Sequence, residues 1–216
     1  MCGRFALESS PRAIAEYLQA EVTGNFVSRY NIAPTTPVLA RTASRITFLR
    51  WGLVPSWAKD TAMGNRMFNA RSETILQKPS FKNAFKRRRC LIPASGFYEW
   101  HLESGIKQPY FCHINHQLFS FAGIWEHWQD AQGNELQSCA ILTTQAVGGL
   151  ARIHQRMPVV IRDELRDDWL NHSSESTETA LDCISQLNSE FDIYPVSTMV
   201  NASGNDSAEL INPLKT

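Results

Sequence analysis

The sequence lacks any uninterrupted run of apolar residues long enough to cross a membrane. A spanning helix needs roughly 18 or more apolar residues in succession, and no segment of the 216-residue chain has them. The N-terminus also lacks the basic-then-apolar order of a secretory signal. With 43% hydrophobic residues, the chain is expected to be soluble and globular. We therefore expect it in the cytoplasm, at the nucleoid if its source is bacterial, with no membrane partner.

Cysteine pairs with the spacing of a disulfide framework or a metal site are also missing. The five cysteines are odd in number, and no two form a C-x-x-C pair. A disulfide scaffold and a zinc knuckle are therefore poorly supported, and we expect no metal and no cofactor. Roughly four of the five fit free thiols that are buried as small apolar side chains. The five are Cys2, Cys90, Cys112, Cys139 and Cys183.

An excess of charge of one sign is absent as well. The 21 basic and 21 acidic residues cancel, which alone argues against a nucleic-acid partner. The distribution is uneven, because residues 1–100 hold 15 Lys or Arg and 6 Asp or Glu, whereas residues 101–216 hold 6 and 15. Between Glu73 and Glu99 there are 6 basic residues and no acidic one. This asymmetry predicts either a phosphate-binding face or simply a solvated helix face.

No internal repeat, low-complexity tract or long linker divides the chain, so we expect a single domain over residues 1–216. Apolar periodicity predicts helices that begin at Pro11 and that cover 80–88, 163–171 and 177–187. Alternating segments predict strands at 36–41, 45–51, 89–93, 96–102, 108–114, 117–125, 136–144 and 192–196. Residues 202–206 are expected to form a loop. Strands that follow one another, with helices at the edges, favour an α+β fold.

Cys2 is the residue that we expect to carry the chemistry. Removal of Met1, which a small second residue favours, would give Cys2 a free α-amino group. Its pKa of about 7.7–8.0, against roughly 10.4 for lysine, leaves part of the amine neutral near pH 7. The amine can form an imine with an aldehyde, and the thiol can close that imine to a thiazolidine. The alternative interpretation is that Cys2 is an incidental second residue.

Several segments resemble one protein family in the same order along the chain. The opening MCGRFA is also similar to that of glutamine amidotransferases with an N-terminal cysteine, but their Arg-Gly-Pro-Asp and Asn-Gly-Glu-like segments are absent. The later segments resemble the SOS-response-associated peptidase (SRAP) family, also called abasic-site processing proteins. They are RYNIAP at 29–34, WGLVPSW at 51–57, NARSET at 69–74, CLIPASGFYEW at 90–100, FAGIW at 121–125, IHQRMP at 153–158, and PVS at 195–197 with Asn201.

The resemblance implies a catalytic set of Cys2, Asn69, Glu99 and His154. Glu99 lies among aromatic residues, and burial there would raise its pKa and let it donate a proton to the ring oxygen of an abasic sugar. A glutamate on the solvent face of the strand is the alternative. His154 could shuttle protons, although a lone histidine is more often a hydrogen-bonded core residue. Asn69 could hold the amine or the sugar in place, unless it is only a turn residue. His113 and His116 flank a predicted turn and are expected to be exposed.

The resemblance also implies a DNA-binding set. Arg4 and Arg71 match positions that contact the DNA backbone, and Pro34 and Trp57 match apolar groups near the bases. Trp57 is followed by alanine where relatives often have a second aromatic residue, which predicts weaker base stacking. Some relatives have an arginine at the position of Pro79, and the neighbouring Lys78 could replace it as a point charge. The full predicted set is Arg4, Pro34, Trp57, Arg71, Lys78 and Arg156.

Taken as a member of this family, the chain is expected to be a monomeric enzyme that acts on single-stranded DNA containing abasic sites. It would form a thiazolidine crosslink through Cys2, with a lyase-like activity and a possible cysteine-type peptidase or autopeptidase activity, for which removal of its own Met1 is one candidate reaction. Glu99 would also take part in reversal of the crosslink. The expected fold is a mostly antiparallel sheet curled into an open barrel-like core with flanking helices. An N-terminal-nucleophile hydrolase and a non-catalytic single-strand binder are the alternatives.

Overall fold

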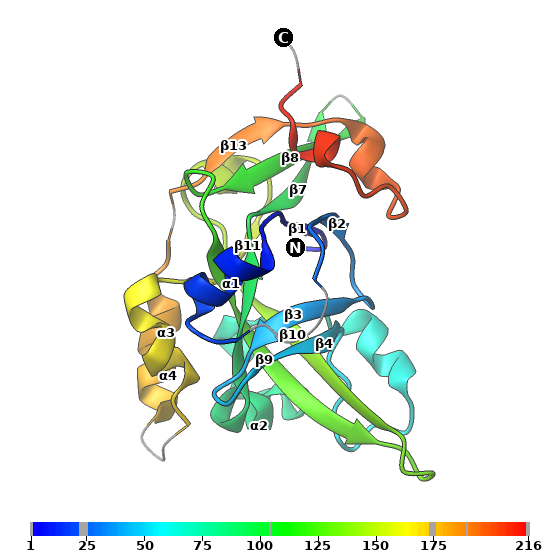
Figure 1. Cartoon of the computed structure of the whole chain (residues 1–216), viewed down its shortest axis with the longest axis vertical. Coiled ribbons are helices and arrows are strands. Elements are labelled where there is room, and N and C mark those ends of the chain that lie inside the picture. Colours follow the sequence, from blue (N-terminus) through cyan, green and yellow to red (C-terminus); the bar gives the residue numbers. More distant parts are fainter. Residues whose placement is uncertain (1, 22–25, 104, 173–175, 189, 215–216) are drawn as a thin grey trace.

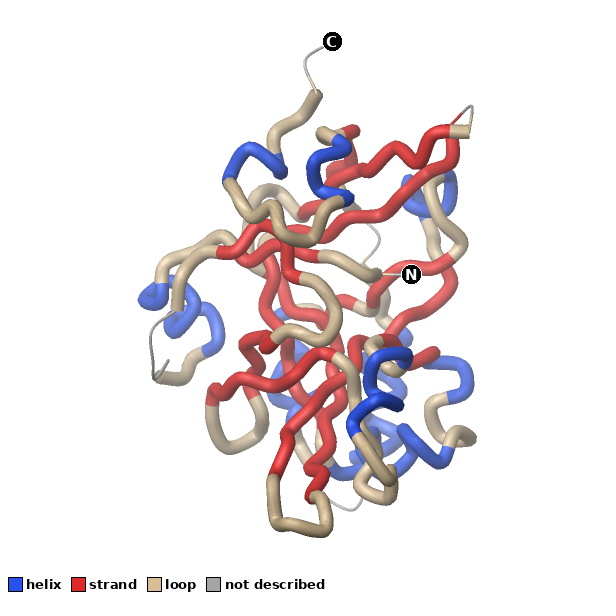
Figure 2. The backbone as a smooth tube through the Cα atoms, turned by 90° about the vertical axis from the view of Figure 1, so that its right-hand side faces the viewer, coloured by secondary structure: helices blue, strands red, loops and turns tan. Residues whose placement is uncertain are grey.

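The strands of this protein form two sheets that meet around a short N-terminal strand (Figures 1 and 2). The computed structural model describes residues 2–21, 26–103, 105–172, 176–188 and 190–214. Across those residues, none of the helices combines the length and the apolar character that a membrane span requires. Met1, whose removal the proposed chemistry requires, lies outside the described residues.

Five strands of the larger sheet pair in a closed ring. Four antiparallel pairings run in order through β4 (Ile46–Trp51), β3 (Pro37–Arg41), β6 (Arg89–Ala94), β9 (Phe119–Gln129) and β10 (Glu135–Gln145). β10 then pairs in parallel with β4, with Ser138 opposite Arg50, which completes the ring. The short strands β5 (Asn69–Arg71) and β11 (Arg156–Pro158) pair with the far end of β10, and β12 (Val160–Ile161) pairs with β9. The predicted α+β class and barrel-like core are confirmed, and the barrel is closed.

The smaller sheet is antiparallel and places β1 beside the barrel. Its order is β13 (Asp192–Pro195), β8 (Ile106–His113), β7 (Gly96–Glu103), β1 (Phe5–Leu7) and β2 (Arg29–Ile32). Only Ser95 separates β6 of the barrel from β7 of this sheet. The Phe5 ring lies 5.2 Å from that of Trp51 and 5.6 Å from that of Phe121, centroid to centroid. The core of both sheets is therefore continuous through β1, which positions the N-terminal residues at their junction.

Helices cover the outside of the barrel (Figure 1). They are α1 (Pro11–Leu18), α2 (Pro79–Arg87), α3 (Arg166–Leu170) and α4 (Ser176–Ser185). The predicted helix start at Pro11 is confirmed, because the Ser10 side chain accepts a hydrogen bond from the Ala13 N–H at 3.2 Å and caps the helix. Short 3-10 helices lie at Thr61–Arg66, Ser72–Thr74, Gly148–Arg152, Asp163–Leu165, Thr198–Asn201 and Ala208–Ile211. The predicted helix at 163–171 is therefore a 3-10 turn followed by the short α3.

All the predicted strands are present, with ends shifted by a few residues. The strands β1, β2, β5, β11 and β12 were not predicted, because segments of two to four residues carry little periodicity; β13, which also has four residues, was predicted. The prediction for His113 is wrong, since this residue is 2% exposed and its ring stacks on His116 at 3.9 Å. β13 pairs alongside β8 and places Asp192 opposite His113, a long-range pairing that local turn signals do not reveal.

Gly96 starts β7 at a point where no side chain fits, and this close approach gives a first prediction. A Cβ atom at Gly96 would lie 2.1 Å from Cζ of Phe111. We expect Gly96→Ala to lower the free energy of unfolding by about 2–3 kcal/mol, since overpacking forces neighbouring rings off their rotamers. Urea denaturation measures the change. Gly204→Ala is the control, because no atom lies within 4 Å of its Cβ position. Equal stability of the two variants would contradict the prediction.

Candidate functional site

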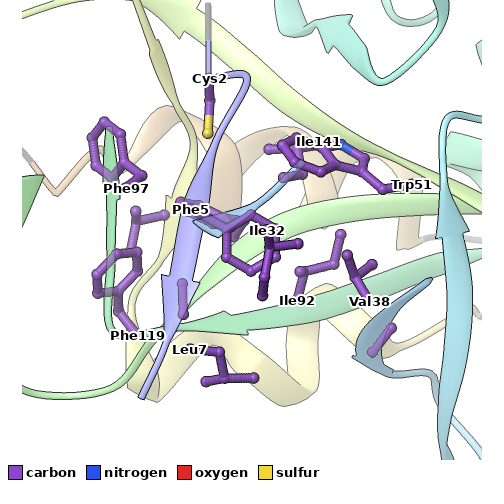
Figure 3. Packing of buried hydrophobic residues seen from close by; sticks show 14 of the residues in the cluster. Cys2, Phe5, Leu7, Ile32, Val38, Trp51, Ile92, Phe97, Phe119 and Ile141 are labelled. Atoms are coloured by element: carbon purple, nitrogen blue, oxygen red, sulfur yellow. The ribbon is translucent and has the colours of Figure 1, made fainter. Parts of the chain in front are cut away.

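Cys2 lies inside the core rather than on the surface. Its side chain is 0% exposed and belongs to the cluster that contains Phe5 and Phe97. Figure 3 shows the sulfur directed toward this cluster. Burial, and secondarily the charge of Glu99, raise the pKa of the Cys2 thiol well above its ordinary value. The thiol is therefore neutral near pH 7.

Asn69 connects the start of the chain to the barrel by a hydrogen bond. It is the first residue of β5, which pairs with β10. Its Nδ2 donates a hydrogen bond to the Cys2 carbonyl oxygen at 2.7 Å. The structure thus brings together two members of the predicted catalytic set. The amide thereby fixes the backbone of Cys2 relative to the barrel.

Glu99 is a buried carboxyl group in β7. It is 2% exposed, so the alternative of a glutamate on the solvent face is wrong. Burial is the main cause that raises its pKa to about 7. Near neutral pH the group is therefore divided between its protonated and ionised forms. A carboxyl with this pKa can both donate and accept a proton at physiological pH.

Glu99 and His154 line the same cavity, which has a volume of about 490 Å³. The Nδ1 atom of His154 accepts a hydrogen bond from the Arg156 N–H at 2.9 Å, which fixes the ring. Burial lowers the pKa of His154, so the imidazole is neutral near pH 7. Because Nδ1 accepts the Arg156 N–H, the neutral ring carries its hydrogen on Nε2. The other lining residues are Arg4, Trp100, Leu102, Lys107 and Asn201.

Arg4 is fixed at the cavity wall by buried polar groups. Its guanidinium donates to Oδ1 of Asn31 at 2.7 Å and to the Val200 carbonyl at 2.9 Å. Asn31 is 1% exposed, and its own amide donates to the carbonyls of Ala202 and Asn205 at 3.1 and 2.7 Å. The predicted DNA-binding cation is thus oriented by a residue whose role the sequence did not indicate.

A second cavity, of about 530 Å³, contains Arg71 and Arg156 in its lining. Arg156 forms a bidentate ion pair with Glu73, in which two guanidinium nitrogens lie 2.6 and 3.0 Å from the two carboxylate oxygens. It also donates a hydrogen bond to the Thr143 carbonyl oxygen at 2.6 Å. The Arg156 hydrogen bond holds the pKa of Glu73 below its usual value. Arg71 is exposed and makes no ion pair with any residue in the described part of the chain. Of the two arginines, Arg71 is the one available to an added phosphate.

The other predicted DNA-binding residues lie outside both cavities. Trp57 is 57% exposed in the segment after β4. Pro34 is half-buried between β2 and β3, and Lys78 is exposed at the start of α2. The structure therefore does not gather the whole predicted set around one cavity.

Sequence reasoning missed several cavity residues. Trp100 directly follows Glu99 in the segment CLIPASGFYEW, and Asn201 follows the segment PVS, so a local signal existed for both. Lys107 and Leu102 belong to no motif, and only the pairing of β7 with β8 places them at the site. Asn31 lies within RYNIAP, but its burial depends on the distant segment around Val200.

Comparisons with known proteins identify the family that this chain resembles. The sequence model described as SOS response associated peptidase (SRAP) matches residues 1–203. The abasic site processing protein YoqW of Bacillus subtilis (strain 168) is 38% identical, covering 98% of this chain and 99% of its own. The abasic site processing protein HMCES of Rattus norvegicus is 35% identical over 85% of this chain and 64% of its own. A crystal structure of a Bacteroides thetaiotaomicron protein has the same fold, with a TM-score of 0.87 at 23% identity, covering 99% of this chain and 100% of its own.

Proposed function

The chain belongs to the SOS response associated peptidase (SRAP) family, and we propose that it processes abasic sites in single-stranded DNA by crosslinking itself to them through Cys2. The observation that carries the proposal is the position of Cys2 itself. Asn69 holds its carbonyl at 2.7 Å, and the charge of Glu99 acts on its thiol. Glu99 in turn shares a cavity with His154. Cys2 itself is buried and does not line the cavity, so Glu99 is the group that connects the nucleophile with the cavity and with His154.

The reaction begins with opening of the sugar. Glu99 in its protonated form donates to the ring oxygen of the closed hemiacetal, while the hydroxyl on C1′ loses its proton and becomes the aldehyde. After Met1 removal, the Cys2 amine attacks C1′, and loss of water gives an imine. The thiol sulfur then bonds to the same carbon as its proton passes to nitrogen, which gives the thiazolidine. Over all the reaction steps one water molecule is lost, and His154 and Glu99 relay the protons.

The burial of Cys2 favours this route over hydrolysis by a cysteine nucleophile. A cysteine hydrolase needs a thiolate, which an electropositive and partly exposed position provides. Here burial raises the pKa of the thiol, so the thiolate is rare near pH 7. An amine that attacks first, followed by a neutral thiol, fits the site better. A peptidase activity limited to Met1 stays part of the proposal as a single maturation event.

Incubation with an abasic single strand, followed by a denaturing gel, tests the proposal. We expect a shifted band that survives denaturation with the abasic strand and no such band with an undamaged strand of the same sequence. A non-catalytic binder would give salt-sensitive binding without the band. Intact-mass measurement of wild-type and Glu99→Gln protein, produced in the same cells, shows whether loss of Met1 depends on Glu99.

Arg71 should act as a phosphate contact with little influence on sequence preference. We expect Arg71→Gln to reduce the slope of log affinity against log salt by about 0.7, the value for one phosphate of a single strand. Binding titrations at several salt concentrations measure this slope. Arg45→Gln, an exposed arginine in the β3–β4 turn, is the matched control for net charge. An identical slope for the two variants would remove Arg71 from the interface.

A further inference from the structure

His101 lies on the same strand as Glu99 and on the same face of the smaller sheet. The two residues are two positions apart in β7, where Glu99 lies opposite Tyr110 and His101 lies opposite Gln108. Residues two apart on a strand point to the same face. His101 is half-buried and takes no part in the proposed chemistry, so its imidazole is a polar group beside the site to which no task has been assigned.

The His101 ring contacts the segment that carries His154. Its Nδ1 atom lies 3.3 Å from the carbonyl oxygen of Ile153, the residue directly before His154. A carbonyl oxygen only accepts hydrogen bonds, so Nδ1 carries the hydrogen and donates it. Ile153 directly follows the 3-10 helix Gly148–Arg152. The hydrogen bond therefore joins β7, the strand of Glu99, to the loop that holds His154.

The loop around His154 is folded by hydrogen bonds of its own. The amides of Ile153 and His154 both donate to the Leu150 carbonyl oxygen at 2.9 Å. The amide of Ala146, which follows β10, donates to the Gln155 carbonyl oxygen at 2.9 Å. These bonds fix the shape of the loop and its attachment to β10, but none of them sets its distance from β7. The hydrogen bond from the β7 imidazole does so, because its donor belongs to that strand.

We propose that His101 is a positioning residue that sets the separation between His154 and Glu99 across the cavity. It holds the backbone next to His154 against the strand of Glu99, and it does not itself exchange protons with the sugar. This inference rests on the proposed function, because it presumes that both groups relay protons during crosslinking. Proton relay requires close placement of the groups, and a displacement of about 1 Å can cost roughly 10²-fold in rate.

Three variants of the full chain separate this role from a general effect. His101→Ala removes the donor, and His101→Asn replaces it. The amide nitrogen of asparagine is as many bonds from the backbone as Nδ1 of histidine, so it can donate to the same carbonyl oxygen. His127→Ala is the matched control, because this half-buried histidine lies on β9, pairs with Glu135 at 3.3 Å and lines neither cavity.

Amide hydrogen exchange tests the contact without any reaction. We expect the amides of Ile153 and His154 to exchange about three- to tenfold faster in His101→Ala than in wild type, because the loop loses one hydrogen bond. In His101→Asn and His127→Ala these amides should exchange as in wild type. The amides of β6 in the barrel are the internal reference, since a general loss of stability would accelerate their exchange as well.

The rate of crosslinking tests the role of the contact. With protein in saturating excess over an abasic strand, we expect His101→Ala to crosslink about tenfold more slowly than wild type, and His101→Asn to recover most of that loss. The affinity for a strand with tetrahydrofuran, the abasic analogue without an aldehyde, should stay within about twofold of wild type. A merely structural defect would lower this affinity too and would not be recovered by asparagine.

Unchanged exchange of the Ile153 and His154 amides in His101→Ala would overturn the inference, and so would a normal rate of crosslinking by this variant. The proposed function fails on a separate observation, which is that wild-type protein does not crosslink an abasic strand at all. In that case the exchange rates still decide whether His101 holds the His154 loop against β7.

Discussion

Cys2→Ala is expected to abolish the crosslink that survives denaturation. The variant keeps an N-terminal amine after Met1 removal, so it can still form the imine, but it has no sulfur to close the ring. The imine hydrolyses on the gel, whereas the thiazolidine persists. Borohydride should therefore restore a band for Cys2→Ala, because it reduces the imine to a stable amine. The measurement is the crosslinked fraction with and without borohydride.

The control for this prediction is Cys139→Ala. Cys139 is also 0% exposed and belongs to the same core cluster as Cys2, so it reports the general effect of removing a buried sulfur. We expect Cys139→Ala to crosslink like wild type. If Cys2→Ala crosslinked like wild type without borohydride, the thiazolidine mechanism would be wrong.

Glu99→Gln is expected to slow crosslink formation by about 10²–10⁴-fold, the usual effect of a positioned general acid. Ring opening needs protonated Glu99, so the wild-type rate should fall as pH rises through about 7, the pKa of this group. The reacting amine must be neutral, so the rate should also fall below its pKa of about 7.7–8.0. The wild-type profile is therefore bell-shaped, with a narrow maximum between mildly acidic and mildly alkaline pH.

The Glu99→Gln variant should lose the decline of the rate on the alkaline side of this pH profile. Glutamine does not titrate, so the Glu99→Gln rate should be low and should rise with pH until the amine is neutral. Reversal of the purified crosslink should slow as well. Glu103→Gln, on the exposed part of the same strand, is the control. A Glu99→Gln profile that keeps the alkaline decline would assign that decline to another group.

Local patterns predicted most of the fold. Ser10 and Pro11 mark the start of α1, and the long alternating segments of β7 to β10 were identified because they exceed the length at which periodicity becomes distinctive. Closure of the barrel depends on the parallel pairing of Ser138 with Arg50, which joins segments far apart in the chain. No local signal specifies such a pairing, so the sequence predicted a barrel-like core but not its closed ring.

The candidate site was predicted in part. The aromatic neighbours of Glu99 correctly indicated a buried carboxyl group with a raised pKa. The sequence did not reveal that Arg156 pairs with Glu73, because a motif cannot show whether a cation is already paired. It also did not reveal Lys107, whose place at the cavity arises from the register of a hairpin.

The intact mass of the wild-type crosslink, with fragmentation to locate the modified residue, tests the thiazolidine mechanism most directly. A thiazolidine at Cys2 has the mass of the protein without Met1 plus the abasic strand minus one water, and borohydride leaves this mass unchanged. A mass that includes Met1, a gain of two hydrogens on reduction, or a modification at any other residue would contradict this mechanism.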